Sequence, residues 1–177
     1  MSDDLGRVDA FAASIATTPW FSRIGHALTR EDEESLADSV FGLGLEPGAI
    51  AAVATWKEAA RVAVDPNWDR RWWSAEAREQ TRLQAWAEER HGADAALKAL
   101  TRVAEAALGP TRAAAEAEAA NDEALSRVAA GAAAQACHLA ALALAAGKPD
   151  HGFLAKHRLF ATGRWPLGRI AERWYLF

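Results

Sequence analysis

Residues 93–146 read ADAALKALTRVAEAALGPTRAAAEAEAANDEALSRVAAGAAAQACHLAALALAA, and 25 of these 54 residues are alanine. Alanine has the highest intrinsic helix propensity of the common residues, so this composition predicts long helices. Its small side chain also gives a helix a smooth surface, which lets neighbouring helix axes approach to about 8 Å. The stretch therefore predicts closely packed helices at the centre of an all-α fold.

Two helical segments are expected within this stretch. Asn121 and Asp122 interrupt it and begin the more regular helix, in which apolar and small residues recur at alternating spacings of three and four. This spacing is typical of the seam between packed helices. Upstream, Gly109-Pro110 predicts a break or kink, because proline lacks the backbone N–H that a helix interior uses. The predicted seam consists of Leu125, Val128, Ala132, Gln135, Leu139 and Leu142.

The aromatic residues lie on either side of the alanine-rich stretch. All eight Trp, six Phe and the single Tyr fall within Phe11–Trp86 or Phe153–Phe177, with none between. A buried aromatic side chain removes about 150–250 Å² from water. The two flanks are therefore expected to supply the bulk that fills and covers the alanine-rich helices.

Helix start and stop signals divide the flanks into shorter helices. Thr29 is a typical N-cap, and the acidic residues 31–34 after it suit the positive end of a helix dipole, so they need no metal to explain them. Pro47 stands where the start of a helix tolerates proline, and Gly92 is expected to close a helix capped by Ser74. The expected helices cover about 4–16, 30–41, 47–64, 74–91 and 150–162.

The C-terminal residues 164–177 combine turn residues with apolar ones. We expect a hairpin that pairs Leu167–Ile170 with Trp174–Phe177, and one last helical turn is the alternative. No repeat or linker divides the chain. The sequence thus predicts one domain over residues 1–177, a bundle of about six to eight mostly antiparallel helices with a short non-helical C-terminus.

Net charge and cysteine content indicate the kind of partner and the cellular compartment. The net charge is −4, but residues 148–177 hold six basic and two acidic residues, which predicts either a basic tail docked on an acidic body or a site for an anionic partner. The single Cys137 excludes an intramolecular disulfide, and the N-terminus lacks a secretory pattern, so we expect a cytoplasmic protein. Abundant alanine with 16 Arg against 4 Lys is typical of a GC-rich bacterial genome.

The apolar run 128–146 approaches the length of a membrane span. Only Gln135 and His138 interrupt its 19 residues, but alanine is weakly hydrophobic, so we predict a buried helix and no membrane partner. Buried polar groups need partners. Gln135 and His138 therefore indicate either an internal hydrogen bond or a pocket between their helix and the segment Lys156–Trp165. In the pocket interpretation the ligand-binding residues are Gln135, His138, His157, Arg164 and Trp165.

Three tryptophans form a second candidate group. Trp68 and Trp72 are four residues apart and can share a helix face, with Trp73 beside them. They are interpreted either as core residues or as anchors of an interaction surface, where tryptophan is enriched. Basic and aromatic residues also alternate after Lys156, but the isoelectric point of about 5.7 makes nucleic acid an unfavoured partner.

No sequence pattern for catalysis, metal binding or cofactor binding is present. The five histidines lack HExxH and zinc-finger spacing, and there is no phosphate-binding loop or nucleophile motif. We therefore predict no catalytic residue, no metal and no cofactor. The predicted function is a non-enzymatic binding or protein-interaction module of immunity or adaptor type, with a protein partner or a homo-oligomer. The alternative is a small-ligand-binding protein or an enzyme that uses the pocket beside Gln135 and His138.

Overall fold

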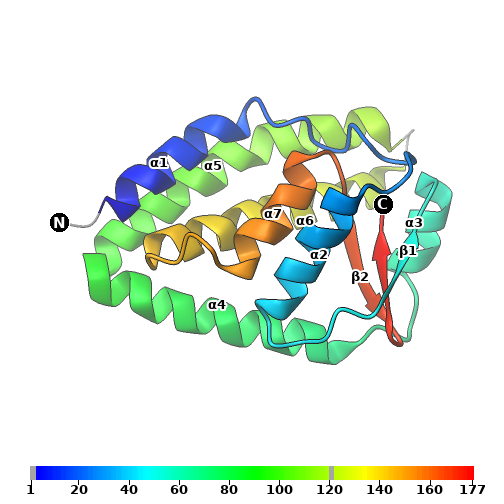
Figure 1. Cartoon of the computed structure of the whole chain (residues 1–177). Helices are drawn as coiled ribbons and strands as arrows, with labels where there is room; N and C mark the ends of the chain where they lie inside the picture. Colours follow the sequence, from blue (N-terminus) through cyan, green and yellow to red (C-terminus); the bar gives the residue numbers. More distant parts are fainter. Residues whose placement is uncertain (1–2, 120–121) are drawn as a thin grey trace.

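The computed structural model describes residues 3–119 and 122–177, which form seven helices and a three-stranded sheet (Figure 1). α5 (Ala93–Glu118) and α6 (Glu123–Ala145) run antiparallel and pack against each other more extensively than any other pair of elements. Alanine side chains make much of this contact, and Ala107 of α5 and Ala133 of α6 are fully buried. The predicted helical class and the alanine-rich centre are confirmed.

Further helices cover this central pair. α1 (Asp4–Ile15) and α4 (Arg70–His91) each pack on both α5 and α6, while α7 (Gly152–Ala161) packs on α6. α2 (Arg30–Phe41) packs on α7. The backbones meet closely there, because a Cβ at Gly42 would lie 2.6 Å from Cα of Gly152. The short helix α3 (Trp56–Ala63) lies at the sheet end of the molecule (Figure 1).

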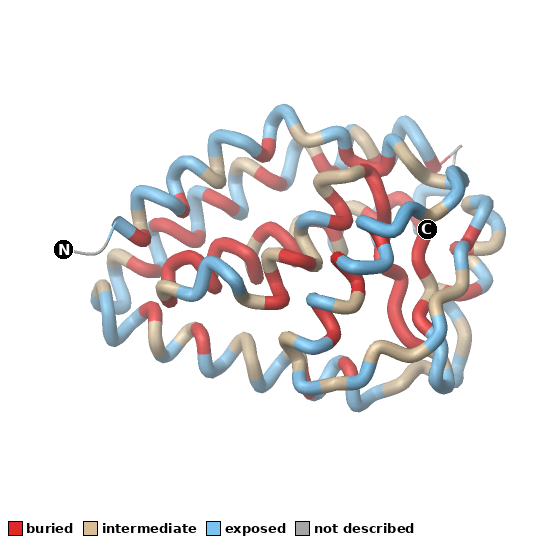
Figure 2. The backbone as a smooth tube through the Cα atoms, viewed as in Figure 1, coloured by how far each residue is buried: buried red, intermediate tan, exposed pale blue. Residues whose placement is uncertain are grey.

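α6 is enclosed by its neighbours. Thirteen of its 23 residues are buried, and the tube in Figure 2 shows that burial concentrated in the middle of the molecule. α6 is also the one described helix that is long and apolar enough to cross a membrane, yet 61% of that stretch is buried inside the protein. Such burial is the pattern of a core helix.

The sheet forms at the end of the molecule opposite the N-terminus (Figure 1). β2 (Pro166–Ile170) and β3 (Arg173–Leu176) pair antiparallel, and β1 (Ala49–Ala52) pairs parallel with β3, giving the order β1-β3-β2. The predicted C-terminal hairpin is confirmed, with each strand beginning one residue earlier than expected. An isolated bridge joins Trp68 to Ile170, so the segment before α4 lies against the outer edge of β2.

Two predicted helix starts are confirmed by their capping bonds. The Thr29 hydroxyl accepts a hydrogen bond from the Asp32 N–H, and the Asp32 carboxylate accepts one from the Thr29 N–H. This reciprocal pair is a capping box. The carboxylate of Asp122 accepts a hydrogen bond from the Leu125 N–H and starts α6.

The helix predicted from Pro47 is wrong. Ala49–Ala52 is strand β1, because its backbone pairs with β3, and α3 begins only at Trp56. Thr55 is the N-cap: its side chain accepts a hydrogen bond from the Glu58 N–H, and Glu58 accepts one from the Ala54 N–H.

Two other helix boundaries differ from the prediction. α5 continues through Pro110 without a break, and the Thr111 hydroxyl donates to the Ala107 carbonyl beside it. α4 begins at Arg70 with Asp69 as its N-cap, four residues before the predicted start. The earlier start brings Trp72 and Trp73 onto a helix, but Trp68 lies before it and bridges to Ile170, so Trp68 and Trp72 do not share a helix face as predicted.

Candidate functional site

A cavity of about 400 Å³ lies where α4, α6, α7 and β2 meet the end of α3. This volume is within the range of about 300–1,000 Å³ that small-molecule sites occupy. Three helices, α4, α6 and α7, contribute residues at helical spacing. The lining residues are Ala63, Val64, Asp65, Trp68, Trp72, Trp73, Glu76, Val128, Ala132, Gln135, Lys156, Phe160, Trp165, Pro166 and Leu167. We call this space the tryptophan cavity.

Three indole rings form one wall of the tryptophan cavity. Trp68 stacks on Trp73 with ring centroids 5.9 Å apart, and Trp72 lies 6.4 Å from Trp68 and 6.3 Å from Trp73. The rings differ in exposure: Trp72 is 7% exposed, whereas Trp73 is 49% exposed. The wall therefore runs from the core to the surface and offers flat apolar area along its length.

A glycine on β2 makes room for this wall. Gly168 has a φ of +138°, and a Cβ there would clash with Cζ3 of Trp68 and lie 2.5 Å from Cζ3 of Trp72. The pairing of β2 with β3 is irregular between Pro166 and Gly168. The strand thus accommodates the two rings at a position where only glycine fits without strain.

An ion pair crosses the inner part of the tryptophan cavity. Lys156 Nζ lies 2.6 Å from Glu76 Oε2, and both side chains are largely buried. The same ammonium lies 5.3 Å from the centre of the Trp72 ring, which is cation–π distance. Lys156 is therefore held by a carboxylate and an aromatic face together.

Two other polar side chains line the tryptophan cavity. The Asp65 carboxylate accepts a hydrogen bond from the Asn67 N–H at 2.8 Å, and no basic side chain pairs with it within residues 3–119 and 122–177. Gln135 makes no hydrogen bond with any described residue. Gln135 is exposed, so the prediction of a buried seam position is wrong, and its amide is free to bond to a ligand or to water.

The mouth of the tryptophan cavity is apolar. Val64 is 79% exposed and Val128 is 52% exposed, and both lie with Trp73 at the opening. Large apolar side chains are costly to expose, about 25 cal/mol for each Å². These three residues, which we call the rim, are therefore candidates for contact with a ligand or a partner.

The structure brings together only part of the predicted pocket. Gln135 and Trp165 line the tryptophan cavity, and Trp68, Trp72 and Trp73, predicted as a separate interaction surface, line the same space. His138, His157 and Arg164 do not line it.

The three predicted residues outside the cavity are held within the protein. His138 is half-buried, and burial lowers its pKa. His157 packs edge-on against Phe11 and Trp20, where burial lowers its pKa to about 4. Cys137 precedes His138 on α6. Its thiol is also buried, which raises the pKa of that thiol to about 12 and keeps it protonated at neutral pH.

Arg164 is fully buried and fully occupied by internal partners. Its Nε donates to Asp32 Oδ2 at 3.1 Å, and its terminal nitrogens donate to three carbonyls. Those carbonyls belong to Arg23, His26 and Ala27. Although burial alone raises the pKa of Asp32, hydrogen bonds from Thr29 and the charge of Arg164 hold it below the ordinary value.

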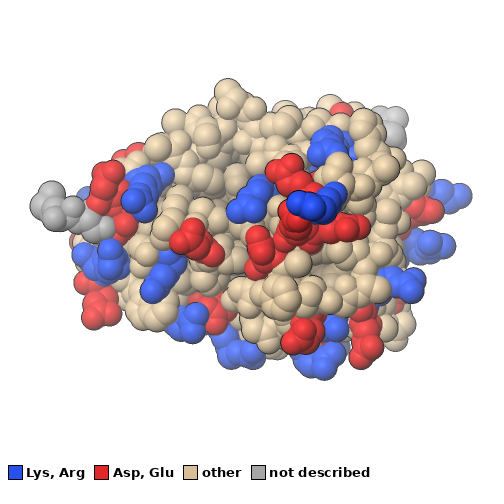
Figure 3. Space-filling model, in the orientation of Figure 1, with Lys and Arg blue, Asp and Glu red and all other residues tan. Residues whose placement is uncertain are grey.

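Much of the basic C-terminal segment is paired with the acidic body. Lys156, Arg158, Arg164 and Arg169 pair with Glu76, Asp38, Asp32 and Asp69 respectively. On the face shown in Figure 3, acidic and basic side chains are intermixed. Most of the excess positive charge of residues 148–177 is therefore compensated by ion pairs with acidic residues of the same protein.

Sequence reasoning missed several lining residues. Glu76 follows Trp72 by four residues on α4, a helical spacing that could have placed it on the same face. Asp65 comes directly after the expected helix 47–64 and carries no sequence signal for a site. Gly168 carried no sequence signal, because the rings it accommodates come from nearly 100 residues earlier in the chain.

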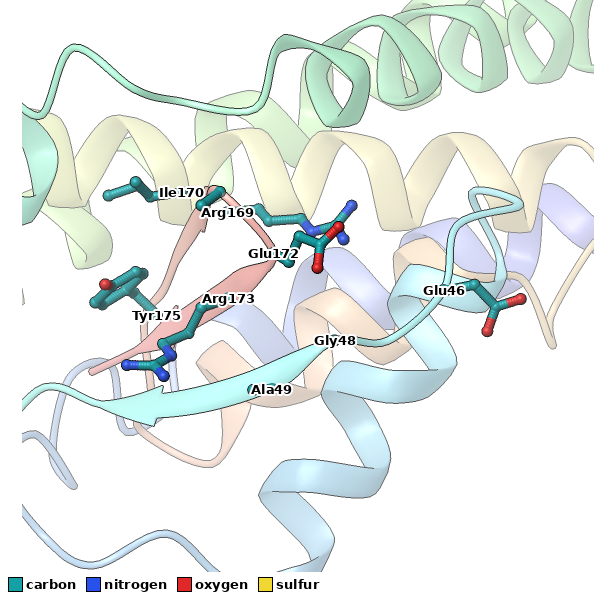
Figure 4. A pocket seen from close by; sticks show the side chains of 9 residues that line it. Glu46, Gly48, Ala49, Arg169, Ile170, Glu172, Arg173 and Tyr175 are labelled. Atoms are coloured by element: carbon teal, nitrogen blue, oxygen red, sulfur yellow. The ribbon is translucent and has the colours of Figure 1, made fainter.

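A second, larger hollow of about 640 Å³ lies at the turn of the C-terminal hairpin (Figure 4). The residues that line it carry charges of both signs, from Glu46, Glu172, Arg169 and Arg173. Arg169 is held from behind, where its guanidinium lies 3.1 Å from Asp69 Oδ2. This hollow has no aromatic wall comparable to that of the tryptophan cavity.

No family model, no curated protein and no solved structure matches the chain. Within the described ranges, no group of three or more His, Cys, Asp or Glu side chains is placed to hold a metal ion.

Proposed function

We propose that this protein is a non-catalytic binding protein that takes a flat apolar group into the tryptophan cavity. The observation that carries the proposal is the continuous wall of Trp68, Trp72 and Trp73, which runs from the core to a half-exposed ring at the mouth. Aromatic rings bind flat ligands by burial and by stacking, which adds about 0.5–1.5 kcal/mol for each ring pair. The free Gln135 amide supplies a polar contact that would orient the ligand.

The chemistry of the lining supports binding rather than catalysis. Its titratable groups are Asp65, Glu76 and Lys156, and two of these three neutralise each other. No His, Cys or Ser is among the residues that line the cavity. A nucleophile with an adjacent base, the usual basis of covalent catalysis, is not part of this lining.

The test of the proposal is calorimetric titration of the protein with indole, a flat apolar probe. We expect binding in the millimolar range or tighter, and we expect Trp73→Ala to weaken it about tenfold. Trp73 is half exposed, so its removal leaves the core intact. The matched control is Trp86→Ala, because Trp86 lies farther along α4, beside Arg82 and Lys148, and outside the cavity. Equal indole affinity in the two variants would contradict the proposal.

A second candidate function, a protein-interaction module, is favoured by the rim. Val64, Trp73 and Val128 expose apolar surface around one opening, and such residues anchor many protein interfaces. The oligomeric state tests this candidate. If the rim is a self-association surface, sedimentation equilibrium will show a dimer that Val64→Asp dissociates. A monomer at all concentrations would remove self-association from consideration.

The cellular setting is part of the same proposal. A single buried cysteine, Cys137, is compatible with a reducing compartment, and we place the protein in a bacterial cytoplasm. Neither a membrane nor a nucleic acid is a proposed partner, because α6 is largely covered and the basic C-terminal side chains are largely paired.

A further inference from the structure

The charge of the tryptophan cavity restricts the ligands that it can bind. Three charged side chains line it: the ammonium of Lys156 and the carboxylates of Glu76 and Asp65. Lys156 is satisfied by Glu76 at 2.6 Å and by the face of Trp72 at 5.3 Å. Asp65 has no basic partner among the described residues. The cavity therefore carries one uncompensated negative charge.

The aromatic wall also favours a positively charged ligand. The face of an indole ring carries negative electrostatic potential and attracts cations, by about 0.5–2 kcal/mol in partly desolvated sites. Lys156 already uses one such face, that of Trp72. Trp68 and Trp73, which stack on each other, line the same cavity as Asp65. An incoming positive charge thus meets aromatic faces and a carboxylate, whereas an incoming carboxylate meets like charge.

We propose that the natural ligand of the tryptophan cavity is a small organic cation, with a flat aromatic body for the tryptophan wall and an ammonium group for Asp65. This proposal rests on the proposed function and names its ligand class. The Gln135 amide, on the α6 side of the cavity, binds a polar atom of the aromatic body. The ligand is a free small molecule, because a cavity of about 400 Å³ holds a body of that size.

Three probes that share one ring system separate charge from shape. Indole is neutral, tryptamine adds an ammonium, and indole-3-acetate adds a carboxylate. Titration calorimetry at low salt is expected to show tryptamine binding about tenfold more tightly than indole-3-acetate, with indole between them. The difference should shrink as salt is raised, because salt screens charges near the surface.

The Asp65→Asn variant tests the residue that sets the preference. Asparagine keeps the side-chain oxygen that accepts the Asn67 N–H, so the local turn is preserved while the charge is removed. We expect tryptamine affinity to fall about fivefold and indole affinity to stay unchanged. Asp94→Asn, a charge change in the first turn of α5 and outside the cavity, is the matched control and should alter neither.

Failure of this inference is distinguishable from failure of the proposed function. If indole-3-acetate binds as tightly as tryptamine, or more tightly, the charge preference is wrong while ligand binding stands. If none of the three probes binds at about 1 mM, the proposed function itself is wrong. If the capped peptide acetyl-Trp-Lys-amide binds more tightly than tryptamine, the occupant is a side chain of a protein partner, and the assignment to a free small molecule is overturned.

Discussion

Arg164 is the largest fully buried side chain of the described structure, and its guanidinium bonds only to groups of the protein itself. Asp32 and the carbonyls of Arg23, His26 and Ala27 take its donors, which ties the start of β2 to the loop before α2. Trp165, the next residue, lines the tryptophan cavity. The arginine therefore positions the segment that carries one wall of the site.

Arg164→Met is expected to lower the free energy of unfolding by about 3–5 kcal/mol, because it removes the buried charge partner of Asp32 and leaves that carboxylate only the longer ion pair with Arg23, at 3.7 Å. Urea denaturation measures the change. Arg158→Met, an exposed position on α7, should lower it by less than about 1 kcal/mol. A loss at Arg164 no larger than that at Arg158 would contradict a structural role for the buried charge.

His157 makes the stability depend on pH. Burial between Phe11 and Trp20 lowers its pKa from 6.5 to about 4 in the folded state, and its Nε2 has no partner. The unfolded chain therefore binds the proton more readily, and the stabilising contribution is present above pH 6.5 and lost as the pH falls toward 4. Burial also lowers the pKa of His138 and His151, which adds to the same slope.

His157→Phe is expected to flatten this slope by removing on the order of 3 kcal/mol of pH-dependent stability between pH 6.5 and 4. The measurement is urea unfolding at a series of pH values. Leu108→Gln, at an exposed position without a titratable side chain, serves as the control and should leave the slope unchanged. If the two variants show the same profile, His157 is not the group responsible.

At the scale of elements, β2 is shaped by the rings that pack on it. Gly168 lies where a Cβ would enter the space of Trp68 and Trp72, in a backbone conformation that other residues adopt only with strain. The strand and the wall of the tryptophan cavity therefore depend on one residue without a side chain.

Gly168→Ala is expected to destabilise the fold by about 1–3 kcal/mol and to weaken indole binding, because the rings must move. Thermal unfolding and calorimetry measure the two effects. Gly109→Ala on α5 is the contrasting control: nothing lies within 4 Å of its Cβ position, so alanine there should stabilise the helix by about 0.5–1 kcal/mol. A neutral Gly168→Ala would show that the wall adapts.

Local sequence signals could predict the helices and strands that form through interactions between residues close in the sequence. The alanine-rich α5 and α6, the Thr29 capping box and the antiparallel hairpin each depend on residues close in sequence. β1 does not: Ala49–Ala52 contains only one β-branched residue, Ile50, and its partner β3 lies more than 100 residues away. Its strand conformation follows from tertiary pairing, which no short pattern contains.

At the scale of the whole molecule, the tryptophan cavity is a product of packing between distant segments. Gln135 and Trp165 could be proposed from the sequence because polar and aromatic residues stood out in or beside an apolar helix. Trp68, Trp72 and Trp73 could be recognised as a group, but not as neighbours of Lys156. Their meeting requires α4 and α7 both to lie against α6, an arrangement set by the complete core.

The central claim, that the tryptophan cavity binds a flat cation, is tested most directly by the indole N–H signals of the eight tryptophans in a ¹⁵N–¹H NMR spectrum, recorded during titration with tryptamine. The expected result is a shift in the signals of Trp68, Trp72, Trp73 and Trp165, which line the cavity, with those of Trp20 and Trp86 unchanged. Single Trp→Phe variants assign the signals. Shifts confined to Trp86, or no shift at a saturating tryptamine concentration, would contradict the claim.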